Sequence, residues 1–286
     1  MKFRKCSKKS ENSTYYIFKF LFLIFVSLVT ITARAQNDNW TQLGMVKFPQ
    51  NPSVQTTGMG RISHIAFHPT DSNIIYAASA SGGLWRSINE GKTWTVLTDA
   101  LPYTSCASVI VNHKNPKTLY LGTGDANYYG GGNGVYKSYD EGKTWTQMNF
   151  GMGNALVVQM YMHPKDTNII IASTHLGIFK SVNGGGSWVK KSTVTDNYND
   201  LAGKPNSNSG LYVTSKQSFY YSNDFGETWT QKKVSATDTF SSIMIGVSKA
   251  DSNLLYVVTW RNKISTGKTY FGGVFKSKDG GQNWRL

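Results

Sequence analysis

Two loop segments of the chain combine aromatic rings with charged and amide side chains, a mixture that suits recognition of sugars or peptides. Rings supply apolar contact area, and a few polar groups beside them fix the orientation of a ligand. The first segment, 124–134, is rich in glycine, and the second spans 260–271. The candidate binding residues in them are Asp125, Asn127, Tyr128, Tyr129, Trp260, Arg261 and Tyr270. We expect a glycan or a cell-surface protein as the ligand; the alternative is that these side chains only pack the rim of the fold.

Histidine and cysteine form no comparable constellation. His68 and His163 precede proline in equivalent turns of different repeats, which would lie far apart, so we expect no metal site. Cys106 lies in an apolar run that is typical of a buried strand, where a thiol is inert, so we expect no catalytic cysteine. The sequence predicts no cofactor and no catalytic residue.

The strongest pattern is a turn sequence, Ser-x-Asp/Asn-x-Gly-x-x-Trp, that occurs five times with 41 to 55 residues between successive tryptophans. The acidic or amide positions are Asn89, Asp140, Asn183, Asp224 and Asp279, and the tryptophans are Trp94, Trp145, Trp188, Trp229 and Trp284. An Asp or Asn side chain can bind the N–H groups of its own turn, and the glycine can adopt a positive φ. Because each turn serves its own hairpin, we expect a structural role for these residues.

A period of this length, between short apolar runs, predicts four-stranded units that bury their faces against one another. The 28 glycines and the aromatic share of 13% favour strands and tight turns as well. We therefore predict an all-β fold, a β-propeller with five blades present out of six or more. The expected blades are 62–98, 107–149, 155–191, 206–233 and 242–286, with a closing strand at 40–44.

The N-terminal residues have the pattern of a secretory signal peptide. A basic stretch precedes an apolar run at 20–31, and Ala33-Arg34-Ala35 follows as a cleavage site. We expect removal of residues 1–35, export of a monomer that occupies 36–286, and no membrane span after cleavage. Much of the net charge of +14 lies in that segment. No feature of the rest favours nucleic acid as a partner.

The five turns resemble the Asp-box (BNR) repeat of sialidases, of the xyloglucan-hydrolysing propeller family and of sortilin-type propellers. The segment from Gly60 to Ser87 is similar to exported propellers of bacteria with type IX secretion. These resemblances imply a propeller fold, which can host many different functions.

The resemblance also allows a test of catalysis. Glycoside hydrolysis needs two carboxylates on either side of the scissile bond. In the xyloglucan-hydrolysing family one of them directly precedes the turn that corresponds to Ser81-Gly82-Gly83, where this chain has Ala80. We therefore expect a non-catalytic binding or scaffold module rather than an enzyme. The alternative is a glycoside hydrolase acting on polysaccharide, with its catalytic carboxylates outside these residues.

Overall fold

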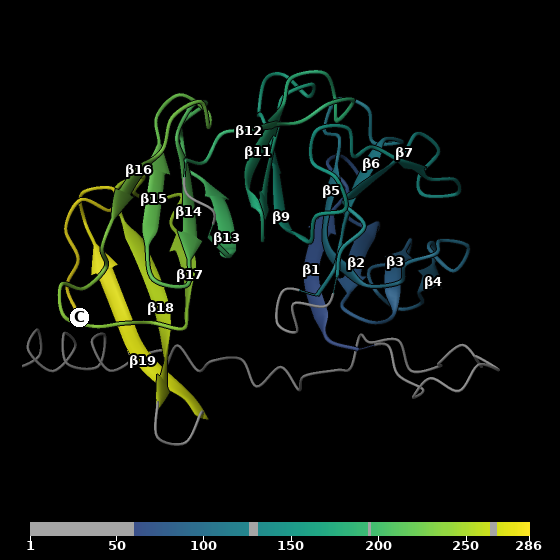
Figure 1. Ribbon diagram of the computed structural model, residues 1–286. Helices are drawn as coiled ribbons and strands as arrows, with labels where there is room; N and C mark the ends of the chain where they lie inside the picture. The colour runs from purple at the N-terminus through teal and green to yellow at the C-terminus, as the bar shows by residue number, and fades with distance from the viewer. Residues whose placement is uncertain (1–59, 126–130, 194–195, 264–267) are drawn as a thin grey trace, which may run out of the picture. The chain divides into compact units, whose positions relative to one another are not determined.

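The chain folds into a series of antiparallel sheets that follow one another along the sequence (Figure 1). The computed structural model describes residues 60–125, 131–193, 196–263 and 268–286. The chain divides into two units, Met1–Gln42 and Leu43–Leu286, and the described residues all belong to the second. All the regular elements in the described residues are β-strands. This part of the chain contains no helix that could cross a membrane. The all-β prediction is confirmed, whereas the predicted signal peptide and closing strand lie outside the described residues.

Five sheets account for all the strands in these ranges. The first contains β1 (Ile62–Phe67), β2 (Ile75–Ser79), β3 (Gly83–Ser87) and β4 (Thr95–Val96). The second contains β5 (Cys106–Val111), β6 (Leu119–Thr123), β7 (Val135–Ser138) and β8 (Thr146–Gln147). The third contains β9 (Val157–Met162), β10 (Ile170–Thr174), β11 (Gly177–Ser181) and β12 (Val189–Lys190). The fourth contains β13 (Tyr198–Gly203), β14 (Leu211–Ser215), β15 (Phe219–Ser222) and β16 (Thr230–Lys232). The fifth contains β17 (Ser242–Val247), β18 (Leu255–Lys263) and β19 (Lys268–Ser277).

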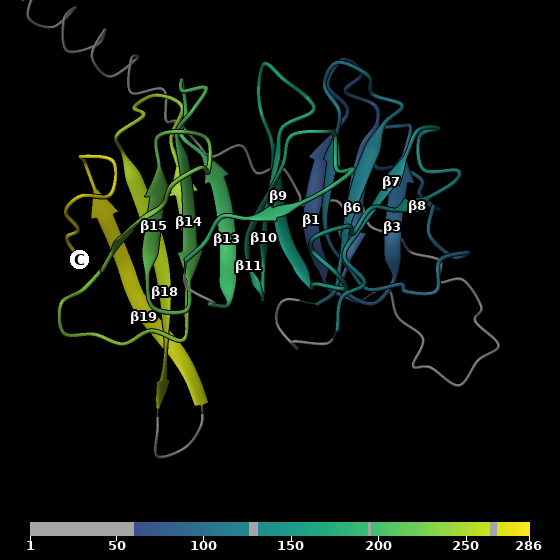
Figure 2. The same ribbon diagram turned by 45° about the horizontal axis from the view of Figure 1, so that its top comes forward.

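Each sheet is a meander whose strands pair in sequence order, and each packs face to face on the next (Figure 2). Four apolar cores lie between successive sheets. In the core between the first two sheets, Leu84 of β3 packs with Val109 of β5 and Leu121 of β6. Short meanders stacked in chain order, each burying its faces on its neighbours, are the arrangement of a β-propeller.

The second strand of each of the first four sheets lies in the middle of this packing. All five residues of β6, β10 and β14 are buried, which explains why their sequences are nearly continuous apolar or small-residue runs. The short outer strands β4, β8 and β12 are largely exposed. A strand covered on both faces cannot show the alternating pattern of a half-buried one.

The fourth and fifth sheets differ in detail from the sequence-based expectation. The fourth begins at β13, upstream of the expected range 206–233. Because β13 mixes Asn, Asp and Gly with only two buried apolar side chains, Tyr198 and Leu201, it lacks the signature of an inner strand. In the fifth sheet, Arg285 pairs with Lys276 through an isolated bridge rather than a full fourth strand.

The five repeated turns share one hydrogen-bond pattern. In the second sheet, Asp140 Oδ1 accepts from Ser138 Oγ at 2.7 Å and from the Thr144 N–H at 2.9 Å. The Ser138 hydroxyl oxygen in turn accepts from the Gly142 N–H at 2.8 Å. The equivalent bonds occur in the other four turns. In every turn the residue before the glycine also has a positive φ, and at Glu90, Glu141 and Phe225 it is not glycine.

In two of the turns the tryptophan also connects neighbouring sheets. The indole N–H of Trp145 donates to the Leu97 carbonyl of the preceding sheet at 3.0 Å. The indole N–H of Trp188 donates in the same way to the Met148 carbonyl at 2.8 Å. The turns of the second and third sheets therefore contribute both to hairpin closure and to the stacking of the sheets.

Candidate functional site

The sheets have two different ends, and the candidate binding residues that the structure describes, Asp125, Trp260, Arg261 and Tyr270, lie at the end opposite the repeated turns. We define the loop end as the end where the second strand of each sheet finishes and the first begins. The strand register places the end of the second strand beside the start of the first, since Ser79 pairs with Ile62 and Trp260 pairs with Ser242. Loop residues at one end of a propeller can act together on one ligand although they are distant in sequence.

Asp125 lies at this end, immediately after β6, and contacts the first sheet. Its Oδ1 accepts from Arg61 Nη2 at 2.6 Å, and its carboxylate is largely shielded while the arginine is partly exposed. Arg61 precedes β1, and its carbonyl accepts the Ala80 N–H at 2.9 Å. The fold thus brings a carboxylate from the second sheet to the loop that contains Ala80.

Ala80 itself is buried, and its carbonyl accepts a 2.5 Å hydrogen bond from Ser105 Oγ. Its backbone is therefore held by groups from both the first and second sheets. The Tyr103 hydroxyl, which precedes β5, donates to the Gly131 carbonyl in the segment 124–134. The candidates Asn127, Tyr128 and Tyr129 lie outside the described residues.

The second candidate group lies on the long hairpin of β18 and β19, which extends past neighbouring strands in Figure 1. Arg261 pairs with Tyr270 in the strand register, and Trp260 pairs with Phe271. The ring of Tyr270 is 48% exposed, and Phe271 is more exposed still. The structure therefore places all three candidates on one hairpin, with Arg261 and Tyr270 on one face and Trp260 on the other.

Arg261 is oriented by groups that precede β17. Its Nη2 lies 2.8 Å from Asp238 Oδ2, and its guanidinium carbon lies 5.6 Å from the centre of the buried Phe240 ring. A planar guanidinium can pair with a carboxylate and contact an aromatic ring at the same time. Because Arg261 pairs directly with Tyr270, the guanidinium and the exposed Tyr270 ring lie on the same face of the hairpin, an arrangement suited to a polar ligand that carries apolar faces.

Several residues with a role in this geometry were not found from the sequence. Arg61 and Asp238 are separated from their partners by loops or whole strands, so no local spacing pointed to them, whereas Phe271 lies within the segment 260–271 but was not chosen as a candidate. Asp200 on β13 accepts N–H groups from Ile245 and Leu201, at 2.9 Å each, and joins the fourth and fifth sheets. Burial raises the pKa of this carboxyl, while the two N–H donors oppose the shift.

The inner strands also carry polar contacts between sheets, among them one made by His64. His64 on β1 lies with its Nε2 3.1 Å from Gln159 Nε2 on β9, a connection between the first and third sheets. Burial lowers the pKa of the His64 ring. Within the described ranges, no group of three or more His, Cys, Asp or Glu side chains gathers as metal ligands would.

Comparison with known proteins supports the fold and the repeat. The model of the BNR/Asp-box repeat matches residues 220–231. Among solved structures, an ancestral GH74 enzyme superimposes with a TM-score of 0.63 at 20% identity, over 85% of this chain and 32% of that chain. A GH74 enzyme of Niastella koreensis gives 0.55 at 21% identity, over 79% and 45%. YCF48 bound to D1 peptide gives 0.52 at 13% identity, over 84% and 83%. The predicted resemblance to Asp-box propellers is confirmed.

Three curated relatives of this chain are named as xyloglucanases. A xyloglucanase of Hypocrea jecorina is 28% identical over 233 residues, which are 73% of this chain and 26% of the relative. A xyloglucanase of a Paenibacillus species is 25% identical over 91% of this chain and 23% of its own length. Xyloglucanase Xgh74A of Acetivibrio thermocellus is 23% identical over 80% and 26%. The chain spans about a quarter of the length of these relatives.

These relatives correct the sequence-based interpretation of function. The expectations of a non-catalytic binding or scaffold module and of no enzyme are wrong, because the relatives that match are xyloglucanases. The inference from Ala80 considered carboxylates near in sequence only. In the fold, Asp125 reaches the same loop from the next sheet through its 2.6 Å contact with Arg61. A missing acid at one loop position therefore could not decide the matter.

Proposed function

We propose that the chain is part of an exported glycoside hydrolase that acts on a xyloglucan-type polysaccharide and that its loop end binds the sugar chain. The observation that carries this proposal is the similarity to xyloglucanases over 73% to 91% of this chain. Hydrolysis of such a polymer needs a long binding surface with aromatic platforms and orienting polar groups, besides a pair of carboxylates.

The hairpin of β18 and β19 supplies the features of an aromatic platform. A pyranose ring has apolar C–H faces and an equatorial rim of hydroxyls, so it can lie on an exposed ring while a charged group binds its rim. Tyr270 supplies an exposed ring on the same face as its register partner Arg261, and Arg261, held by Asp238, supplies N–H donors, while Phe271 exposes a ring on the opposite face. We assign sugar binding to this hairpin.

Asp125 is the second candidate contact with the sugar. Its ion pair with Arg61 fixes the carboxylate beside the loop of Ala80. A carboxylate in this position can accept hydrogen bonds from sugar hydroxyls. We propose a sugar-binding role for Asp125, and the same role for the neighbouring candidates Asn127, Tyr128 and Tyr129.

The decisive experiment measures hydrolysis and binding with the same purified protein. Xyloglucan, an unbranched β-glucan and a mannan are each incubated with the chain, and released reducing ends and product masses are recorded. Affinity electrophoresis through each polysaccharide reports binding. We expect shortened oligosaccharides from xyloglucan, and slower migration in xyloglucan than in mannan. The proposal would be refuted by a folded protein whose migration is not slowed by xyloglucan and which releases no oligosaccharides from it.

A variant pair separates the role of Asp125 from a general effect of charge. Asp125→Asn removes the ion pair with Arg61, and Asp99→Asn removes an exposed carboxylate of the first sheet. We expect weaker retardation in xyloglucan for Asp125→Asn and unchanged behaviour for Asp99→Asn. Equal behaviour of the two variants would remove Asp125 from the site.

Export is the remaining element of the proposal. It rests on the basic stretch, apolar run and small-residue pattern of residues 1–35. N-terminal sequencing of the protein recovered from outside the cytoplasm should start at Gln36. An N-terminus that keeps residues 1–35 would contradict it.

A further inference from the structure

Four carboxamide side chains gather at the loop end of the second sheet, where it meets the third. Asn133 directly precedes β7, Gln147 lies on β8, and Asn149 and Asn154 lie in the connection that leads to β9. Gln147 Nε2 donates to the Asn133 carbonyl at 3.0 Å and to Asn133 Oδ1 at 2.9 Å. Asn149 Nδ2 donates to the same carbonyl at 2.7 Å and to Asn154 Oδ1 at 3.3 Å. We call these four residues the amide cluster.

The surrounding backbone fixes the position of the amide cluster. Asn149 Oδ1 accepts the Val135 N–H at 2.7 Å, and Asn133 Nδ2 donates to the buried Tyr136 hydroxyl at 2.6 Å. Gly134 has φ of 72°, and a Cβ at this position would overlap the amide of Asn149. The fold therefore leaves room for this amide and orients it before any ligand is bound.

Two polar atoms of the amide cluster remain available to a ligand. A carboxamide offers two N–H donors and one oxygen acceptor. Among the residues placed by the structure, no group bonds to Gln147 Oε1 or to Asn154 Nδ2, and both side chains are exposed. Because the other polar atom of each amide is bonded inside the cluster, this acceptor and this donor are presented to solvent in a fixed arrangement.

An exposed aromatic residue lies in the connection that carries two of these amides. Phe150 directly follows Asn149 and is 79% exposed. Its carbonyl accepts the Trp188 N–H of the third sheet at 2.9 Å, and a Cβ at Gly151 would overlap the Trp188 carbonyl. The second and third sheets are both in place at this junction, and Phe150 is exposed in their presence. The ring is thus attached to a backbone segment that the third sheet holds.

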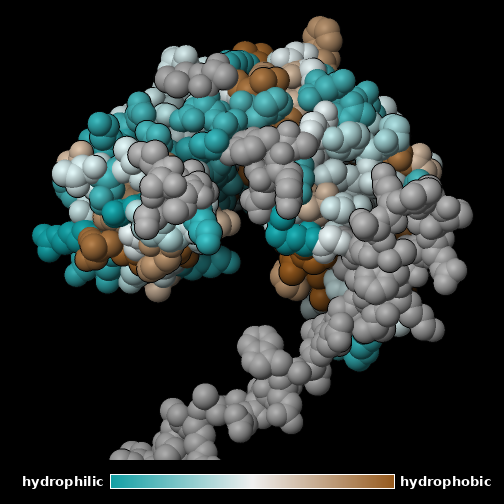
Figure 3. All heavy atoms as spheres, turned by 60° about the horizontal axis from the view of Figure 1, so that its bottom comes forward, coloured by the Kyte–Doolittle hydropathy of each residue, from teal (hydrophilic) through white to brown (hydrophobic). Residues whose placement is uncertain are grey.

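Phe150 does not contribute to the core between the second and third sheets. That core contains Met152, Ala155 and Trp188 from the neighbouring segments, but not Phe150. The described surface drawn in Figure 3 is largely hydrophilic, with brown patches where apolar side chains reach it. A phenylalanine that leaves most of its side chain in water gains little stability from burial, so its ring is available for contact with a ligand.

The composition of this surface favours an uncharged ligand. Segments 131–136 and 146–154 contain no Asp, Glu, Lys, Arg or His. A charged group bound to them would lose hydration without gaining a partner of opposite charge in these segments. A pyranose unit matches them better, because its adjacent hydroxyls can each donate and accept a hydrogen bond while its C–H face lies on an aromatic ring.

From this geometry we propose that the amide cluster and Phe150 form a binding subsite for one uncharged sugar unit of the polysaccharide. Asn154 Nδ2 donates to one hydroxyl, Gln147 Oε1 accepts from the adjacent hydroxyl, and the Phe150 ring covers the C–H face. The subsite rests on the proposed function, because the sugar chain that it receives is the one assigned to the loop end.

The subsite and Asp125 lie at opposite ends of one connection. Segment 124–134 leaves β6 beside Asp125 and returns to β7 through Asn133, whose N–H donates to Thr123 Oγ1 at 2.8 Å. A single sugar chain can therefore contact both as it crosses the loop end of the second sheet. The amide cluster extends the binding surface from the first two sheets to the junction with the third.

The test is affinity electrophoresis of the purified chain through a series of xyloglucan concentrations, which gives a dissociation constant for each variant. Gln147→Ala and Asn154→Ala should each raise this constant about fivefold, the effect of losing one hydrogen bond to the ligand. Phe150→Ala should raise it about tenfold through the lost ring contact. Phe150→Tyr keeps the ring and should bind as the parent does.

The fourth sheet supplies a matched control. Gln231 pairs with Tyr220 in the strand register as Gln147 pairs with Tyr136, and Gln231 donates to Ser218 Oγ at 2.7 Å. Gln231→Ala should leave the dissociation constant unchanged. The melting temperature of every variant is measured alongside and should stay close to that of the parent, because the substituted side chains are exposed.

The outcomes separate the subsite from the proposed function. If Asp125→Asn weakens binding to xyloglucan but the three alanine variants of the subsite do not, the subsite is overturned and the proposed function stands. Equal weakening by Gln147→Ala and Gln231→Ala overturns the subsite as well. A folded parent chain whose migration xyloglucan does not slow overturns both the subsite and the proposed binding at the loop end.

Discussion

The two ends of the sheets are built on different principles. At the end with the repeated turns, each polar group finds its partner within a few residues, as Asp140 does with Ser138 and Thr144. At the loop end, partners come from different sheets, as Asp125 and Arg61 do across 64 positions. The first end can therefore be read from a short sequence, while the second exists only once the sheets have stacked. The difference also separates stability from recognition, because local turns hold the fold and the loops remain available for a ligand.

The largest expected effect breaks a repeated turn through its glycine. Gly281 has φ of 90°, and an added Cβ would lie against the buried ring of Phe219. Gly281→Ala combines the cost of a left-handed residue with overpacking, about 2–5 kcal/mol of unfolding free energy together. Urea denaturation followed by tryptophan fluorescence measures this loss.

A glycine at the loop end provides the control for this substitution. Gly131 has no positive φ, and its added Cβ would meet only Tyr103 Oη at 3.4 Å. Gly131→Ala should change the free energy of unfolding by no more than about 0.5 kcal/mol. If both variants lost the same stability, the two ends would not differ in local constraint.

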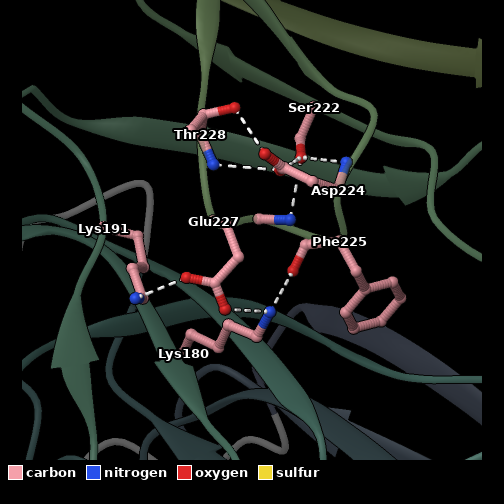
Figure 4. A network of polar contacts seen from close by, with 8 residues as sticks. Lys180, Lys191, Ser222, Asp224, Phe225, Glu227 and Thr228 are labelled. Carbon is pink, nitrogen blue, oxygen red and sulfur yellow. Dashed lines mark hydrogen bonds and ion pairs between the residues drawn. The ribbon is translucent and has the colours of Figure 1, made fainter.

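The next effect concerns the junction between the third and fourth sheets, where Lys180 Nζ donates to the Phe225 carbonyl of the next repeated turn (Figure 4). Lys180→Met keeps the length of the side chain but leaves the Phe225 carbonyl without its buried donor, at a cost of about 1–3 kcal/mol. Lys191→Met removes the other cation of Glu227, which also contacts Lys180, from a more exposed position and should cost less than about 1 kcal/mol. Thermal and urea unfolding of the two variants give the comparison. A larger loss for Lys191→Met would show that the salt bridge, and not the carbonyl, stabilises this junction.

The features that could be predicted from the sequence lie at the end with the repeated turns, and those that could not depend on contacts between sheets. The turns were found because Ser222, Asp224, Gly226 and Trp229 stand at fixed short spacings, and each spacing has a local physical cause. Strand β13 was missed because its polar residues are held by partners in other sheets, such as Ile245 for Asp200. The partners of Asp125 and Arg261 were missed for the same reason. Long-range pairing leaves no period in a single sequence.

The third prediction addresses the loop end directly. Tyr270→Ala removes an exposed ring from the proposed sugar platform and should weaken xyloglucan binding by about 1–2 kcal/mol, or about tenfold. Tyr139→Ala removes an exposed tyrosine from a repeated turn at the other end and should leave binding unchanged. Affinity electrophoresis with both variants measures the contrast. Equal weakening would mean that binding is not confined to the loop end.

The smallest effect distinguishes repeated turns that contain Asp from those that contain Asn. The Thr144 hydroxyl and N–H, together with the Ser138 hydroxyl, hold the pKa of Asp140 at about 2. Because the pKa of an aspartate in the unfolded chain is about 3.9, the ionised carboxylate stabilises the fold above that pH. This contribution is lost as the pH falls toward about 2. Asp140→Asn should lower the melting temperature slightly at pH 6, and the difference from the parent should shrink as the pH falls from about 4 to about 2.

The reverse substitution, Asn89→Asp, tests the same cause in the first sheet. Asn89 Oδ1 already accepts the Thr93 N–H at 2.8 Å, and its Nδ2 contacts Thr93 Oγ1 at 2.9 Å. A carboxylate there can accept from the threonine hydroxyl, as Asp140 does from Thr144. The variant should therefore gain stability at pH 6 relative to pH 2.5 when compared with the parent. If the melting temperature of each variant differed from that of the parent by the same amount at pH 6 and at pH 2.5, the turns would derive their stability from geometry without a contribution from charge.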